Sequence, residues 1–203
     1  MTTVYDELKD KTRSKFEEAV GFVLQAEGGY VSAAEARRRG DRGGETNMGI
    51  SKRAHPTEDL PNMTVDRAKQ IYKRDYWDRV RGDELPKATA FIALDYAVNS
   101  GPGRVHKALR RAVGLPEKGE LTPQVMRRLR KIPDRVLARH LLQDRAEFIL
   151  VRSSVEPQHA RGWAARLKRL AKEAGKRVEG DTQPQVLVTS DTGEPHGGQG
   201  PDA

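Results

Sequence analysis

The chain has 203 residues, of which 36% are hydrophobic and 33% are charged, and it contains no cysteine. This length allows one domain with a sizeable core, or one domain with a small appendix. The absence of cysteine excludes disulfides and cysteine nucleophiles and argues against a structural zinc site. No run approaches the roughly 20 apolar residues that a bilayer-spanning helix needs, so we expect no stable membrane insertion.

The net charge of +8 is unevenly distributed along the chain. Residues 1–100 carry 17 Lys and Arg against 17 Asp and Glu, whereas residues 101–180 carry 20 against 8. Residues 181–203 carry four acids and no Lys or Arg. A basic half indicates a polyanionic partner, and nucleic acid, anionic lipid and bacterial cell wall all meet this condition.

The first predicted helix begins at Ser14, an N-cap residue with Glu17 three positions later, which forms a capping box. Apolar residues then recur at helical spacing, namely Phe16, Val20, Val23 and Leu24. Gly28 and Gly29 end this helix, which places Glu27 in its last turn. Residues 31–60 lack a clean period and hold several glycines, so they predict a loop or a small β-hairpin lobe.

The rest of the chain reads as helices up to about residue 175. A second helix runs from Thr64 through Trp77, and the most apolar helix runs from Lys87 to Ser100, where Gly101-Pro102 end it. Further helices are predicted at about 103–113, from Thr122-Pro123, from Asp134 to about Arg152, and at about 160–174. From about 180 onward the chain is rich in Gly, Pro, Thr and Asp and is expected to be disordered. The fold class is therefore mainly α with one small irregular or β lobe.

Four motifs follow one another along this chain: Glu27–Tyr30, Gly43–Ser51, Ile71–Asp78 and Asp95–Pro102. Together they resemble glycoside hydrolase family 108, the phage and bacterial N-acetylmuramidases. The motifs cover about residues 16–115, and their order makes the resemblance specific. The usual Asp-Pro-Gly-Gly of that family is Asp41-Arg42-Gly43-Gly44 here, which leaves the Asp in place.

The resemblance implies a domain organisation. Residues 1–115 would form a lysozyme-like helical catalytic domain with the small irregular or β lobe. A helical peptidoglycan-binding region over residues 116–178 would pack on it, followed by a disordered tail over residues 179–203. The second match is looser and depends on Gly119–Pro123 and Arg161–Trp163.

Cleavage of a glycosidic bond needs an acid that protonates the leaving oxygen and a second polar group that holds water. Glu27 is the general acid in the family pattern. The negative potential of a helix C-terminus and partial burial both disfavour a carboxylate, which suits a proton donor. Asp41 and Thr46 resemble the water-holding pair of T-even phage lysozymes, which implies inversion at the anomeric carbon. Alternatively, Asp41 starts a turn and Thr46 lines a strand.

Further residues are candidates for contacts with the sugar chain. Tyr30, Tyr72, Tyr76 and Trp77 are candidates for stacking on sugar rings, and we assign Tyr30, Tyr76 and Trp77 as sugar contacts. Aromatic residues at helical spacing are more often core, so we expect two of these four to be buried packing. Asn47 and Asn99 are expected to hydrogen-bond the substrate, and helix capping is the alternative role for Asn99. The glycines of this region, Gly43, Gly44 and Gly49, would let the backbone approach a sugar chain closely.

Other chemistries lack support in the sequence. The five histidines form no metal-ligand spacing, and no nucleophile-elbow sequence accompanies a Ser/His/Asp set. We therefore expect a muramidase without metal or cofactor, which hydrolyses the β-1,4 bond between N-acetylmuramic acid and N-acetylglucosamine. Its partner would be bacterial peptidoglycan. The alternatives are a basic helical nucleic-acid-binding protein and a cell-wall-binding protein without catalysis.

The expected setting follows from the N-terminus and from the resemblance. Met1–Glu7 contains no apolar stretch, so no signal peptide is expected and synthesis would be cytoplasmic. The chain resembles a phage endolysin that a holin releases to the periplasm, or a lysin packaged with virion structural proteins. We expect a monomer that binds no specific nucleic acid.

Overall fold

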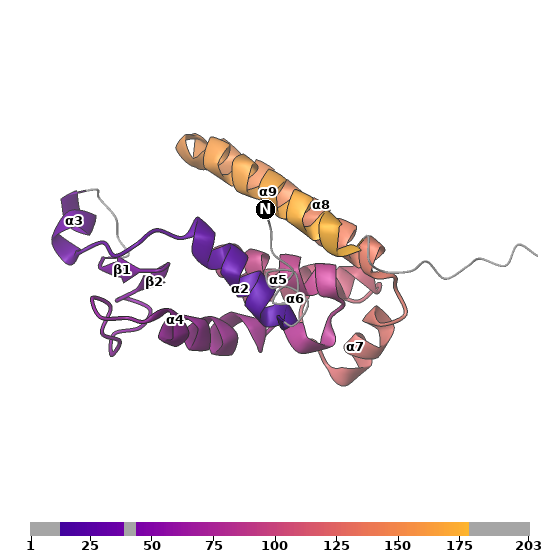
Figure 1. Ribbon diagram of the computed structural model, residues 1–203. Coiled ribbons are helices and arrows are strands. Elements are labelled where there is room, and N and C mark those ends of the chain that lie inside the picture. Colours follow the sequence, from indigo (N-terminus) through magenta and orange to yellow (C-terminus); the bar gives the residue numbers. More distant parts are fainter. Residues whose placement is uncertain (1–12, 39–43, 179–203) are drawn as a thin grey trace, which may run out of the picture.

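The computed structural model describes residues 13–38 and 44–178, and this part of the chain is mainly helical (Figure 1). Helix α2 (Lys15–Ala26) begins as predicted, because the Ser14 hydroxyl accepts a hydrogen bond from the Glu17 N–H at 3.2 Å. It ends where Glu27 adopts an extended backbone. The buried face of α2 packs against the central helix α5 (Lys87–Ser100).

A small lobe lies beyond the C-terminal end of α2 (Figure 1). Its hairpin consists of the antiparallel strands β1 (Thr46–Asn47) and β2 (Ile50–Ser51), which confirms the predicted β lobe. The lobe also contains a helix that the sequence did not predict, α3 (Ala33–Arg38). This helix has six residues and buries only Ala36, so it carries no apolar period that a sequence pattern can reveal.

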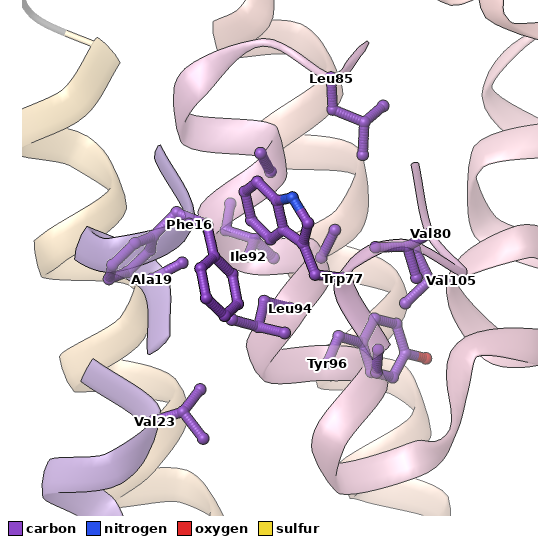
Figure 2. Packing of buried hydrophobic residues seen from close by; sticks show 14 of the residues in the cluster. Phe16, Ala19, Val23, Trp77, Val80, Leu85, Ile92, Leu94, Tyr96 and Val105 are labelled. Atoms are coloured by element: carbon purple, nitrogen blue, oxygen red, sulfur yellow. The ribbon is translucent and has the colours of Figure 1, made fainter. Parts of the chain in front are cut away.

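The predicted helix from Thr64 to Trp77 is present, but its second half is a π-helix. Helix α4 (Val65–Tyr72) starts at Thr64, whose hydroxyl accepts from the Arg67 N–H at 3.2 Å. It continues into the π-helical turn η1 (Lys73–Trp77), and the 3₁₀ helix η2 (Gly82–Glu84) follows. The turn ends at Trp77, a fully buried residue at the centre of the core shown in Figure 2.

Helix α5 is the centre of the molecule, because ten consecutive residues from Ala88 to Ala97 are buried. A helix that is buried on all sides needs partners all round, and α5 has them in α2, α6, α8 and α9. The bounds of the remaining elements are α6 (Pro102–Ala112), α7 (Pro123–Leu129), α8 (Asp134–Val155), η3 (Pro157–His159) and α9 (Ala160–Val178).

Helices α8 and α9 form a long hairpin (Figure 1), and both helices pack against α5. Leu141 of α8 and Leu170 of α9 belong to the same hydrophobic cluster as Phe16 of α2. Among the helices of the described residues, none is long and apolar enough to cross a bilayer. The tail expected to be disordered, residues 179–203, lies outside the described part of the chain.

Candidate active site

Glu27 occupies the point where the chain leaves α2. Its backbone N–H still donates to the carbonyl of Val23 at 3.1 Å, while its own φ and ψ of −85° and 146° are extended. The side chain is 21% exposed, so the carboxylate is partly buried but reachable from solvent. The local sequence produces this geometry, because Gly28 and Gly29 follow and do not continue the helix.

The turn of the β-hairpin lies directly against this carboxylate. Gly49 has a φ of +76°, and a Cβ atom at this position would lie 2.8 Å from Glu27 Oε2 and 2.5 Å from the Tyr72 hydroxyl oxygen. Glycine is therefore needed here both for the left-handed backbone and for the space. The hairpin, the end of α2 and α4 thus meet around one carboxylate.

Tyr72 of α4 contacts the hairpin turn through its hydroxyl group. Its hydroxyl donates to the carbonyl of Met48 at 2.8 Å, and its ring is buried. Burial raises the pKa of Tyr72, and the nearby charge of Glu27 raises it further, so the hydroxyl stays protonated and remains a donor. The Tyr72–Met48 hydrogen bond therefore fixes the hairpin turn beside Glu27.

Glu27 is also held by a residue that is distant in the sequence. Arg166 of α9 donates through Nη1 to Glu27 Oε1 at 2.9 Å and through Nε to Asp95 Oδ1 at 2.9 Å. Asp95 of α5 is fully buried, and its other oxygen is paired with Arg145 of α8. Burial lowers the pKa of Arg166, but the charges of Asp95 and Glu27 outweigh burial and raise it.

This pairing gives Glu27 a partner that the sequence did not predict. The sequence places the carboxylate at a helix end, where the backbone potential disfavours the charge. The guanidinium of Arg166 lies against the same carboxylate, so Glu27 is one partner of a partly buried ion pair.

Of the two water-holding candidates, Thr46 lies within the described residues and Asp41 does not. Thr46 lies half-buried on β1, where its backbone pairs with Val31 and Ser51. Its N–H donates to the Val31 carbonyl at 3.0 Å, so the strand is fixed on both sides. Asp41 lies outside the described residues, and its position relative to Glu27 stays a prediction.

Three of the predicted sugar contacts remain accessible. Tyr30 is 46% exposed, and its hydroxyl donates to Glu45 Oε1 at 2.6 Å. Tyr76 is half-buried, with its ring centroid 5.7 Å from that of Tyr72 beside Glu27. Asn99 is exposed at the end of α5, where its Nδ2 donates to the Asp95 carbonyl at 2.7 Å.

Two predicted sugar contacts need correction. Trp77 is 0% exposed, packs against Phe16 with ring centroids 5.4 Å apart, and donates its indole N–H to Asp83 Oδ1 at 2.9 Å. It is a core residue because the π-helical turn directs it inward. Asn47 is 8% exposed, and its Nδ2 donates to the Leu60 carbonyl at 2.7 Å, so it ties the hairpin to the following loop.

Two residues that hold Glu27 in place were not predicted from the sequence: Arg166, which pairs with Glu27, and Asp95, which pairs with Arg166. Asp95 had a signal, because a carboxylate inside the most apolar helix must find a cation when it is buried. Arg166 had none, since it lies 139 residues from Glu27 and belongs to a helix with many other basic residues. Within residues 13–38 and 44–178, no group of three or more His, Asp or Glu side chains is arranged to hold a metal ion.

Comparison with known proteins indicates a glycoside hydrolase. Residues 20–101, which include Glu27, Thr46 and Asp95, match the family model for glycosyl hydrolase 108. The fold is similar to a solved structure described as "Structure of Brucella abortus SagA", with a TM-score of 0.68 and 29% sequence identity over 80% of this chain and 95% of that chain. No curated protein sequence matches significantly. The chain thus contains a segment similar to glycosyl hydrolase 108, which supports a glycoside hydrolase that acts on peptidoglycan.

Proposed function

We propose that the protein is an N-acetylmuramidase, which hydrolyses the β-1,4 bond between N-acetylmuramic acid and N-acetylglucosamine in bacterial peptidoglycan. The observation that supports this most directly is the position of Glu27, partly buried at the end of α2 and enclosed by a glycine turn, within the segment that matches glycosyl hydrolase 108. The active site would need no metal or cofactor.

In the proposed reaction, the protonated carboxyl of Glu27 gives its proton to the glycosidic oxygen as the bond to the anomeric carbon breaks. A water molecule attacks that carbon from the opposite face and passes a proton to Asp41, while Thr46 orients the water. This arrangement inverts the configuration at the anomeric carbon. Tyr30, Tyr76 and Asn99 would contact the glycan around the cleaved bond.

The proposal also covers how the enzyme reaches the cell wall. Release through a holin, or delivery with a virion, would bring the enzyme to the cell wall. The region over residues 116–178 would add affinity for the wall, which the excess of basic residues in this half supports. The enzyme would work as a monomer.

Substitution Glu27→Gln tests the general acid, because it removes the proton and keeps the shape. General acid catalysis contributes typically 10²–10⁴-fold, and we expect the upper part of that range for a poor leaving group. Lysis in a peptidoglycan zymogram should therefore disappear, while the circular dichroism spectrum and melting temperature show that Glu27→Gln still folds. Retention of more than about a tenth of the wild-type rate would place the acid elsewhere.

Product analysis tests the role of water. A hydrolase leaves a reducing N-acetylmuramic acid end, whereas a lytic transglycosylase leaves a 1,6-anhydro ring. We expect reducing ends in mass spectra of the digested wall, because Asp41 and Thr46 are proposed to hold a water. Anhydro products would contradict that role for both residues and leave the role of Glu27 as a proton donor intact.

A further inference from the structure

A small cavity lies next to the guanidinium that holds Glu27. Its volume is about 80 Å³, roughly the volume of two or three water molecules. Pockets that enclose a whole ligand measure roughly 300–1,000 Å³, so this cavity fits a single group carried by a larger molecule. The end of α5, the middle of α8 and the start of α9 supply its lining: Asn99, Ser100, Arg145, Phe148, Ile149, Arg152, Trp163 and Arg166.

The lining contains three arginines and no acidic side chain. Arg145 and Arg166 are paired with Asp95, and Arg166 also with Glu27, neither of which lines the cavity. Arg152 is 45% exposed and pairs with Glu156, one turn further along α8. Guanidinium groups are geometrically matched to carboxylates, which they bind through parallel N–H groups. Asp95, Glu27 and Glu156 balance these charges from outside the cavity, so the lining offers an incoming group guanidinium N–H donors, chiefly those of the exposed Arg152, and a carboxylate is the acceptor that matches them best.

We propose that this cavity binds a carboxylate of the peptide stems that peptidoglycan carries on its muramic acid residues. This inference rests on the proposed function. One guanidinium touches both the acid and the cavity, so a group in the cavity belongs beside the sugar whose bond is cleaved. Phe148, Ile149 and Trp163 provide apolar surface for the carbon atoms that bear the carboxylate.

Binding there has a consequence for Glu27. The incoming carboxylate competes with Glu27 for the guanidinium of Arg166, so it would loosen the ion pair that holds the Glu27 side chain.

The binding site can be tested without catalysis. The probe is an N-acetylmuramyl peptide, which has no glycosidic bond to cleave, in a form with free carboxyl groups and in a form with amidated ones. The chain has two tryptophans, of which Trp77 is buried and Trp163 lines the cavity, so a change in tryptophan emission reports the cavity. Acetate is the third probe and represents a free carboxylate.

We expect the free-carboxyl peptide to change the emission with saturation, and the amidated peptide and acetate to have little effect. Substitution Arg152→Gln should weaken binding of the free-carboxyl peptide by about tenfold, the loss expected for a charge-assisted hydrogen bond. Arg161→Gln is the matched control, because Arg161 is exposed on the same hairpin, does not line the cavity and removes the same charge. It should change the affinity by less than about twofold.

Equal binding of the two peptides, or equal losses in Arg152→Gln and Arg161→Gln, would overturn the proposal. Saturation by acetate at the same concentration would show a general anion site rather than a site for peptide stems, and would also overturn it. The outcome is separable from the proposed function. Wall lysis that depends on Glu27 without peptide binding rejects the cavity alone, and peptide binding with Glu27-independent lysis rejects the assignment of the acid alone.

Discussion

Gly49 is the residue whose role is most directly set by its surroundings. Substitution Gly49→Ala adds a Cβ that overlaps the Tyr72 hydroxyl and the Glu27 carboxylate, and it places alanine at a φ of +76°. We expect the free energy of unfolding to fall by about 1–3 kcal/mol. Because a displacement of about 1 Å in a catalytic group can cost 10²-fold, the hydrolysis rate should fall by about that factor.

Gly44→Ala is the control for this substitution. Gly44 also has a positive φ, +72°, but no atom lies within 4 Å of the Cβ position. In thermal unfolding, Gly44→Ala should therefore show only the free-energy cost of placing alanine at a positive φ. It should keep most of its activity, measured as the turbidity loss of purified walls. Equal activity losses in both variants would mean that the contact of Gly49 with Glu27 is unimportant.

At the scale of elements, helix α5 receives its N-terminal cap from another helix. Its own N-cap residue is Pro86, whose side chain cannot accept a hydrogen bond. Asp134, the first residue of α8, accepts from the N–H groups of Ala88 and Thr89 at 2.8 and 2.9 Å, and from the Thr89 hydroxyl at 2.5 Å. Asp134 is 5% exposed, so these bonds are shielded from water.

Substitution Asp134→Ala should consequently destabilise the fold. It leaves two buried backbone N–H groups without acceptors, and each such group costs about 1–3 kcal/mol. We expect a loss of about 2–4 kcal/mol and a melting temperature lower by several degrees, measured by calorimetry. Asp134→Asn keeps one acceptor oxygen, so its melting temperature should lie between that of Asp134→Ala and that of the wild type. A melting temperature for Asp134→Ala that equals the wild-type value would show that the cap does not contribute.

The elements show where sequence reasoning succeeds and where it fails. The hydroxyl caps at Ser14, Thr64 and Thr122 are local, and each lies where the sequence predicts the start of a helix. Helix α3 and the burial of Trp77 depend on contacts that form only in the folded chain. The apolar pattern of residues 64–77 gave a helix correctly, but it could not distinguish a π-helical turn, which decides the direction of Trp77.

The residues of the candidate site also fall into those that local sequence predicts and those that only the packing of distant helices brings together. The place of Glu27 at the end of α2 could be predicted from the following glycines, because those signals lie within a few residues, whereas its role as the acid stays a prediction. Arg166 and Arg145 could not, since their pairing with Asp95 requires α5, α8 and α9 to be packed together. The water-holding role of Asp41 stays a prediction, as does the division into a catalytic domain and a wall-binding region.

At the scale of the whole molecule, the uneven charge predicts a salt-sensitive contact with the wall. The Debye length falls from about 10 Å at 0.1 M salt to about 3 Å at 1 M, so sedimentation with purified wall should weaken over this range. Charge reversal at Arg127 and Arg128, both exposed on α7, should loosen binding and slow the lysis of whole walls. Hydrolysis of a short soluble oligosaccharide should change little.

Reversal at Arg53 and Arg79 provides the control, because both are exposed and lie in the half of the chain without net charge. This double variant has the same total charge as the first, so a difference between the two reports position. Wall binding that survives 1 M salt and the reversals on α7 would indicate a specific pocket instead of a general electrostatic contact. Preferential binding to duplex DNA would favour the nucleic-acid alternative.

The ion pair between Arg166 and Glu27 also sets when the candidate site can be completed during synthesis. The two residues are 139 positions apart, and ribosomes add about 5–20 residues per second, so the carboxylate is made roughly 7–28 s before its guanidinium. During that interval α9 is absent, so Glu27 lacks the cation that it shares with Asp95. The pairing of Glu27 therefore appears late, when α9 docks, and a nascent chain that stops before this helix lacks it.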